Sequence, residues 1–144
     1  MGNRGLLRAL QRLAASAEAE AGVKFGQIFL AAPDVDRDLF LGLAHLYRTF
    51  SVRTTLYSSH RDRAVEASAW VHNSPRAGYF PPVTTSEGLD TVLVPNFNLD
   101  LLGHAYFAKA EALLNDMYEL MRHDTPPAKR QRLAKKEGYW KMRR

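Results

Sequence analysis

The apolar positions between Asn3 and Ala19 recur every three or four residues, which is the spacing of one face of an amphipathic helix. Arginines occupy another face of the same segment at intervals of four residues: Arg4, Arg8 and Arg12. Gly22 follows the last turn, so we expect the helix to end before it.

Short apolar or β-branched runs alternate with further helical patterns along the rest of the chain. The runs predict strands over residues 27–32, 52–58 and 91–94. The helical patterns predict helices over residues 37–50, 64–71 and 101–122. Because strands that alternate with helices connect by right-handed crossovers, these elements imply a parallel sheet with helices on both faces. The sequence therefore predicts an α/β fold with about three parallel strands.

Two connections in this pattern carry residues of interest. Asp34 and Asp36 precede the helix predicted over residues 37–50, and either side chain could be its N-cap. Residues 72–88 are rich in proline and glycine, which indicates a long irregular connection of the kind that often lines a site. Tyr79 and Phe80 lie in this connection, and we expect them to form the wall of an acyl or alcohol pocket.

The composition of the 144 residues, with 46% hydrophobic and 24% charged, is ordinary for one globular domain. No apolar run is long enough to cross a bilayer. The absence of cysteine excludes a disulfide framework, a thiol nucleophile and a thiolate metal site. The histidines have no metal-ligand spacing, so no metal or other cofactor is predicted.

The net charge of +5 is concentrated at the end of the chain. Residues 124–144 hold eight basic and two acidic residues, whereas residues 1–123 hold 12 basic and 13 acidic residues. A nearly neutral body argues against a nucleic-acid-binding fold, which would spread cations over a folded face. We therefore expect residues 1–123 to form a partial α/β domain and residues 124–144 to be a solvated, flexible or partly helical tail.

Ionisable residues follow the predicted strands at the edge where α/β sheets place their function. Asp34 comes after the first strand, Asp62 after the second and His104 after the third. An acid followed by a histidine is the second half of the Ser…Asp…His order of an α/β-hydrolase triad. The serine should stand in a G-x-S-x-G elbow, and this chain contains no such motif. Met1-Gly2-Asn3 instead leads directly into the first helix, as the end of an elbow would.

Four stretches in this order resemble those of a known family: MGNRGLLRAL at the start, APDVDRD after the first strand, TTLYSSHRD around the second and LGHAYF before the last helix. Over residues 1–123 they resemble the C-terminal half of a bacterial esterase/lipase-like α/β-hydrolase family, domain of unknown function 900. In that family a His-Ser pair precedes the first helix. The resemblance implies that Met1 occupies the position just after the nucleophile and is an internal methionine taken as the start. As given, the chain would be inactive and cytoplasmic, and any targeting signal would lie in the part before Met1.

The resemblance also implies roles for individual residues. Asp62 would be the triad acid, His104 the general base, and the backbone N–H of Met1 one oxyanion donor. An imidazole titrates near neutral pH, which suits His104 to take a serine proton and return it to a leaving group. Asp34 is the alternative acid, although a capping or turn role also explains it. Ser58 and Ser59 lie at a strand end without the flanking glycines of an elbow, so neither is expected to replace the nucleophile.

Other readings of the same residues stay open. Asp62 could be the N-cap of the helix that follows it, and His104 a histidine that caps or packs at a helix start. The whole chain could be a non-catalytic α/β interaction module whose basic tail binds an acidic partner or nucleic acid. In the hydrolase interpretation, the strand at residues 27–32 would have an exposed edge through which the chain self-associates.

Overall fold

The structure is a computed structural model of the whole chain. It describes residues 2–17, 21–22, 24–60, 74–95 and 105–143. The described part holds a six-stranded sheet in the order β1-β2-β4-β6-β5, with β3 paired to β2 beside this path. The strands are β1 (Phe25–Ala31), β2 (Ser51–His60), β3 (Tyr79–Phe80), β4 (Leu89–Val94), β5 (Leu133–Lys135) and β6 (Trp140–Met142). β1, β2, β4 and β6 run parallel to one another, and β5 is antiparallel to β6.

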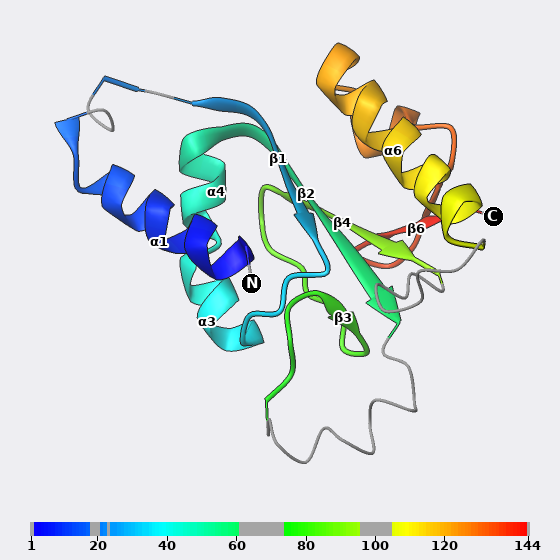
Figure 1. Cartoon of the computed structure of the whole chain (residues 1–144), viewed down its shortest axis with the longest axis horizontal. Helices are drawn as coiled ribbons and strands as arrows, with labels where there is room; N and C mark the ends of the chain where they lie inside the picture. The colour runs from blue at the N-terminus through cyan, green and yellow to red at the C-terminus, as the bar shows by residue number, and fades with distance from the viewer. Residues whose placement is uncertain (1, 18–20, 23, 61–73, 96–104, 144) are drawn as a thin grey trace.

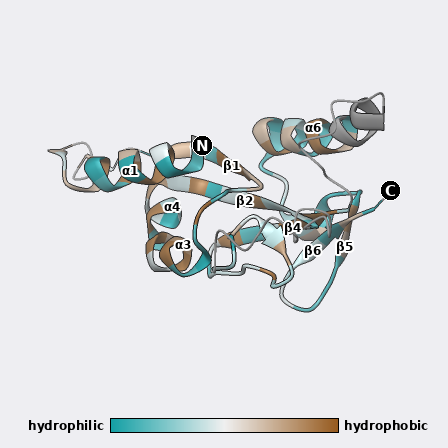
Figure 2. Ribbon diagram, turned by 60° about the horizontal axis from the view of Figure 1, so that its bottom comes forward, coloured by the Kyte–Doolittle hydropathy of each residue, from teal (hydrophilic) through white to brown (hydrophobic). Residues whose placement is uncertain are grey.

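Helices cover both faces of this sheet (Figure 1). They are α1 (Gly2–Ala14), α3 (Arg37–Leu43), α4 (His45–Phe50), α6 (Ala105–His123) and the short 3-10 helix η2 (Pro127–Lys129). α1, α3 and α4 pack with β1 and β2 on one face, whereas α6 lies across the other (Figure 2).

The sheet has one hydrophobic core on each face, because successive side chains of a strand point to opposite faces. In β2, Leu56 belongs to the core under α1, α3 and α4, and its neighbour Tyr57 to the core under α6. Both side chains are fully buried. A strand covered on both faces gives a nearly continuous apolar run, which is the pattern that predicted these strands.

The predicted α/β class is confirmed, with differences at the element boundaries. The three predicted strands correspond to β1, β2 and β4, and β2 extends to His60. The first helix ends at Ala14, earlier than expected. The helix predicted over residues 37–50 is two helices, α3 and α4, with Ala44 between them. The helix predicted over residues 64–71 lies outside the described residues.

Residues 124–143 differ most from expectation, because they contribute strands to the sheet where we expected a flexible or partly helical tail. β6 pairs with β4, and Leu133 and Met142 are buried in the core under α6. Glu137 and Gly138 form the loop between β5 and β6, and Gly138 takes the positive φ of 76° that a tight hairpin favours. The high charge obscured this alternation of apolar side chains.

Candidate functional site

The carboxyl ends of the parallel strands meet at one edge of the sheet. In the register, Ala31 of β1 lies beside Tyr57 of β2, and Ser59 of β2 lies beside Val94 of β4. Segments that leave β1, β2 and β4 therefore start at the same edge. This is the edge where parallel α/β sheets bind their ligands.

The triad residues expected at this edge, Asp62 and His104, lie outside the described residues, as does Met1. Their positions in the chain relative to described elements are still informative. Asp62 follows β2 by two residues, and His104 directly precedes α6. β2 before Asp62 and β4 before His104 were predicted from the sequence, whereas the helix expected after Asp62 lies outside the described residues.

The two acids after β1 both have structural partners. Asp34 is largely exposed, and its carboxylate lies 3.3 Å from Nε of Arg76. Asp36 is the N-cap of α3, as the sequence allowed, and accepts a hydrogen bond from the backbone N–H of Leu39 at 2.9 Å. That hydrogen bond is the main reason that the pKa of Asp36 lies below its ordinary value.

The segment around Gly78, just before β3, is bound across the ends of β1 and β2 by backbone hydrogen bonds. Gly78 accepts a hydrogen bond from the N–H of Ser59 at 2.9 Å and donates one to the carbonyl of Pro33 at 3.0 Å. A Cβ added at Gly78 would lie 2.2 Å from the carbonyl carbon of Ala32, so only glycine fits there. Ala32 itself has a positive φ of 39°, an unusual backbone conformation for alanine. At the carboxyl edge, the backbone of Gly78 therefore packs directly against the backbone of Ala32 and Pro33.

Aromatic rings line the outer part of this edge. The ring of His60 meets that of Phe80 edge to face, with 5.1 Å between ring centroids. Phe80 in turn packs against Tyr139, at 6.1 Å. His60, Phe80 and Tyr139 thus form an aromatic cluster at this edge, of which Tyr139 was not foreseen. The pocket wall expected from Tyr79 and Phe80 stays a prediction.

Ser58 and Ser59 are buried in β2, with 1% and 2% of their surface exposed. The Oγ of Ser58 has no hydrogen-bond partner among the described residues. Neither serine stands in a strand-to-helix turn, since β2 continues to His60. Their geometry is that of core residues.

A hollow of about 350 Å³ opens beyond the end of β4. Its lining includes Pro95, which follows β4, together with residues of the β5–β6 hairpin. Its cations are Lys136, Lys141 and Arg143. We call it the basic hollow. No pattern in the sequence predicts this hollow, because a run of basic residues at this end of the chain is typical of a solvated tail.

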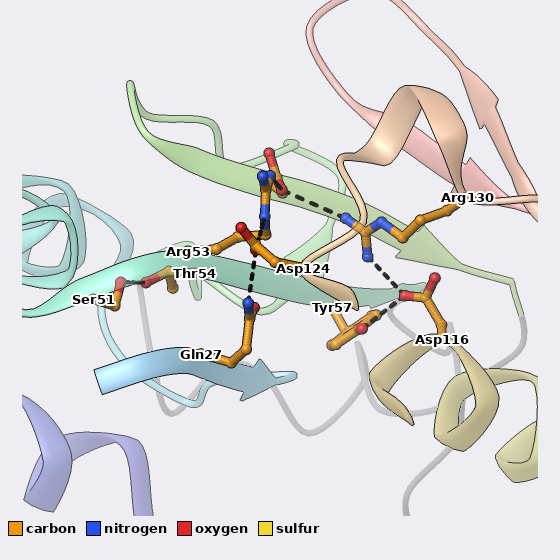
Figure 3. A network of polar contacts seen from close by, with 9 residues as sticks. Gln27, Ser51, Arg53, Thr54, Tyr57, Asp116, Asp124 and Arg130 are labelled. Carbon is orange, nitrogen blue, oxygen red and sulfur yellow. Dashed lines mark hydrogen bonds and ion pairs between the residues drawn. The ribbon is translucent and has the colours of Figure 1, made fainter. Parts of the chain in front are cut away.

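A polar network lies on the face of the sheet that α6 covers (Figure 3). Asp116 of α6 accepts hydrogen bonds from the hydroxyl of Tyr57 at 2.7 Å and from Arg130 at 2.8 Å. The side chain of Arg130 is fully buried, and that of Asp116 is 4% exposed. Burial is the main cause that raises the pKa of Tyr57, with the nearby Asp116 carboxylate adding to it.

The same network continues toward the amino ends of the strands. Arg53 donates to Asp90 at 2.8 Å and to Asp124 at 2.7 Å, and Gln27 also donates to Asp124 at 2.7 Å. These hydrogen bonds, that of Arg53 first, hold the pKa of Asp124 below its ordinary value. Because Gln27, Arg53 and Asp90 stand near the starts of their strands, the network lies away from the carboxyl edge and acts on stability.

A protein-family model described as alpha/beta hydrolase of unknown function (DUF900) matches residues 1–122. The chain belongs to this family. The match confirms the resemblance found in the sequence, and it includes β1, β2 and β4 together with the positions of Asp62 and His104. The β5–β6 hairpin and Arg130 lie beyond the part matched by the DUF900 model. Neither a search of curated proteins nor a search of solved structures found a match.

In the part of the chain that the structure describes, no group of three or more histidine, aspartate or glutamate side chains could hold a metal ion. None of the described helices is long and apolar enough to cross a membrane.

Proposed function

We propose that this DUF900 chain is the acid-and-base half of a serine hydrolase that cleaves small acyl esters. His104 is the general base, Asp62 orients it, and the nucleophile is a serine in a segment that precedes Met1. The observation that carries the proposal is the family match over residues 1–122, which contains both residues in the order of the triad.

The arrangement of the described strands supports this assignment. β2 and β4 are adjacent and parallel, with Ser59 beside Val94 at their carboxyl ends. The segments that carry Asp62 and His104 therefore leave neighbouring strands at one edge. An acid and a base must come within hydrogen-bond distance to act together, and adjacent strand ends favour this.

The contacts of Asp34 favour Asp62 as the acid. Asp34 already pairs with Arg76 at 3.3 Å, and its side chain is 60% exposed. A triad acid works best when it is shielded from water and free to accept from the imidazole. Asp34 instead joins the end of β1 to the segment that crosses it.

The chemistry follows the general course of serine hydrolysis. His104 takes the hydroxyl proton as serine oxygen attacks the ester carbonyl, and Asp62 stabilises the resulting imidazolium. The imidazolium then gives the proton to the departing alkoxide, which leaves an acyl-serine. Water, deprotonated by the same imidazole, then attacks the acyl carbonyl. The carboxylic acid leaves as the imidazolium returns the proton to the serine oxygen. In a chain continuous through Met1, the backbone N–H of Met1 would donate to the oxyanion.

Hydrolysis of 4-nitrophenyl acetate tests this proposal. The chain as given should show only background hydrolysis, because a base without a nucleophile contributes little. The chain extended at its N-terminus through the His-Ser pair should turn over the ester. In the extended protein, His104→Ala and Asp62→Asn should each lower kcat by about 10³-fold or more.

Matched variants separate catalysis from general damage. His45→Ala and Asp38→Asn change the same residue types at exposed helix positions, and each should alter kcat by less than about twofold. Asp34→Asn should have a similarly small effect. A large loss with Asp34→Asn and none with Asp62→Asn would contradict the choice of acid. An extended protein that is folded and hydrolyses no ester would contradict the proposed function.

A further inference from the structure

One face of the β5–β6 hairpin supplies the cations of the basic hollow, and Pro95 and Met142 complete its lining. Side chains alternate along each strand, so Ala134 and Lys136 share a face with Lys141 and Arg143. The antiparallel register places Ala134 directly opposite Lys141. Leu133 and Met142 belong to the other side of the hairpin, where they enter the core under α6. The hairpin is therefore apolar toward α6 and cationic toward the hollow.

The position of Lys141 is not explained by protection of a sheet edge. Lysines on edge strands prevent sheets from pairing with one another, and β5 is such an edge. Lys141 stands on β6, which lies between β4 and β5, and its side chain is only half-exposed. A cation on an interior strand needs another reason.

The cations of the hollow have no acidic partners in the described part of the chain. Within residues 2–17, 21–22, 24–60, 74–95 and 105–143, no carboxylate forms an ion pair with Lys136, Lys141 or Arg143. Like charges that line one small hollow repel each other, so an anion between them would be stabilised. The small side chain of Ala134 leaves room for such a group beside Lys141.

The hollow also lies beside the proposed active edge. Pro95, which lines it, begins the stretch that leads from β4 to His104. Tyr139 is on the same face of β6 as Lys141, and its ring packs on Phe80. An aromatic wall thus continues from the cations toward the end of β2. A volume of about 350 Å³ suits a small ligand group.

We propose that the basic hollow binds an anionic group, carboxylate or phosphate, of the ester that this protein cleaves. The substrate is then an acidic ester, whose charged end lies between Lys141 and Arg143 and whose apolar part rests on the aromatic wall. This inference rests on the proposed function for its substrate role. The binding of an anion does not depend on it.

The first test measures binding alone, with the chain as given. Inorganic phosphate and succinate are titrated into the protein at low ionic strength and followed by NMR of the backbone amides. Shifts should cluster at residues 134–143 and saturate. The double variant Lys141→Gln/Arg143→Gln should weaken binding by about tenfold or more, whereas Lys129→Gln, an exposed control in η2, should not. The absence of saturable shifts, or equal effects of all variants, would overturn the site.

The second test measures substrate choice in the extended protein. It compares 4-nitrophenyl hemisuccinate with 4-nitrophenyl butyrate, which has a similar acyl chain without the charge. The wild type should prefer the hemisuccinate in kcat/KM, and the double variant should lower that preference by about tenfold or more. Lys129→Gln should keep it. Equal use of both esters by the wild type would overturn the substrate assignment.

The outcomes distinguish the two proposals. Anion binding by the chain without ester hydrolysis by the extended protein would contradict the proposed function and support the anion site. A single-stranded oligonucleotide that binds the hollow far more tightly than phosphate, with a steep salt dependence, would indicate a nucleic-acid surface and overturn the small-substrate proposal.

Discussion

Removal of the Arg130 guanidinium should destabilise the protein more than any change at a surface cation. Arg130 is fully buried and donates to Asp116 at 2.8 Å, with Asp90 at 3.5 Å. Among the described residues, Arg130→Ala leaves the buried Asp116 carboxylate with the hydroxyl of Tyr57 as its one side-chain donor. Breaking a buried ion pair on one side costs about 3–5 kcal/mol, because the remaining charge stays uncompensated.

The expected loss for Arg130→Ala is near the lower end of that range, about 3 kcal/mol, since Tyr57 still serves Asp116. Such a loss is a large part of the 5–15 kcal/mol typical of a whole domain. For a chain of this size it lowers the Tm by roughly 10 °C. Urea unfolding followed by circular dichroism measures the free energy of unfolding, and calorimetry measures the Tm.

Two further variants make this prediction specific. Lys129→Ala removes the same charge from an exposed neighbouring position and should change the free energy of unfolding by less than about 0.5 kcal/mol. The triple variant Tyr57→Phe/Asp116→Leu/Arg130→Met replaces the buried polar groups together, so it should recover most of the loss. Equal effects of Arg130→Ala and Lys129→Ala would refute the burial argument. A triple variant as unstable as the sum of its single changes would refute the coupling.

Two shorter predictions concern the carboxyl edge and the free strand. Gly78→Ala should destabilise by about 1–3 kcal/mol in urea unfolding, because its Cβ would overlap the backbone of Ala32; Gly42→Ala, in α3 with open space around it, should instead be neutral or stabilising. Equal effects of the two changes would contradict the close contact. β1 pairs only with β2 among the described strands, so the isolated chain should self-associate in sedimentation velocity. Phe25→Lys should reduce that association, whereas Val52→Lys, at an apolar and even more exposed position on the interior strand β2, should not. A monomer at all concentrations would count against an open edge.

Most of the sheet could be predicted because its strands are buried on both faces. The runs at residues 27–32 and 91–94 are apolar almost throughout, and no competing pattern exists for them. The cap at Asp36 was also visible, since an aspartate precedes the apolar period of α3. The break at Ala44 was not predicted, because the one glycine near it, Gly42, is a residue that a helical pattern tolerates.

The role of Arg130 could not be predicted from the chain order. Its neighbours in the sequence are also basic, and such a run of charges predicts a solvent-exposed segment. Its partners Asp116 and Asp90 lie 14 and 40 residues away. A hairpin signal was present in the apolar positions Leu133 and Met142 around Gly138, but the surrounding lysines and arginines hid it. The triad acid and base, by contrast, were suggested by family resemblance and chain order and stay a prediction.

The end of the chain links the stability of this structure to its proposed specificity. β6 supplies the partner of β4 and carries Lys141 on the face away from α6. Arg130 binds the segment before the hairpin to α6 and β4 through Asp116 and Asp90. A loss of Arg130 should therefore loosen the hairpin and weaken anion binding in the basic hollow, although Arg130 does not line it. The triple variant Tyr57→Phe/Asp116→Leu/Arg130→Met should then bind the anion more tightly than Arg130→Ala does. It removes the unpaired charge of Asp116 and keeps the apolar packing that holds the hairpin.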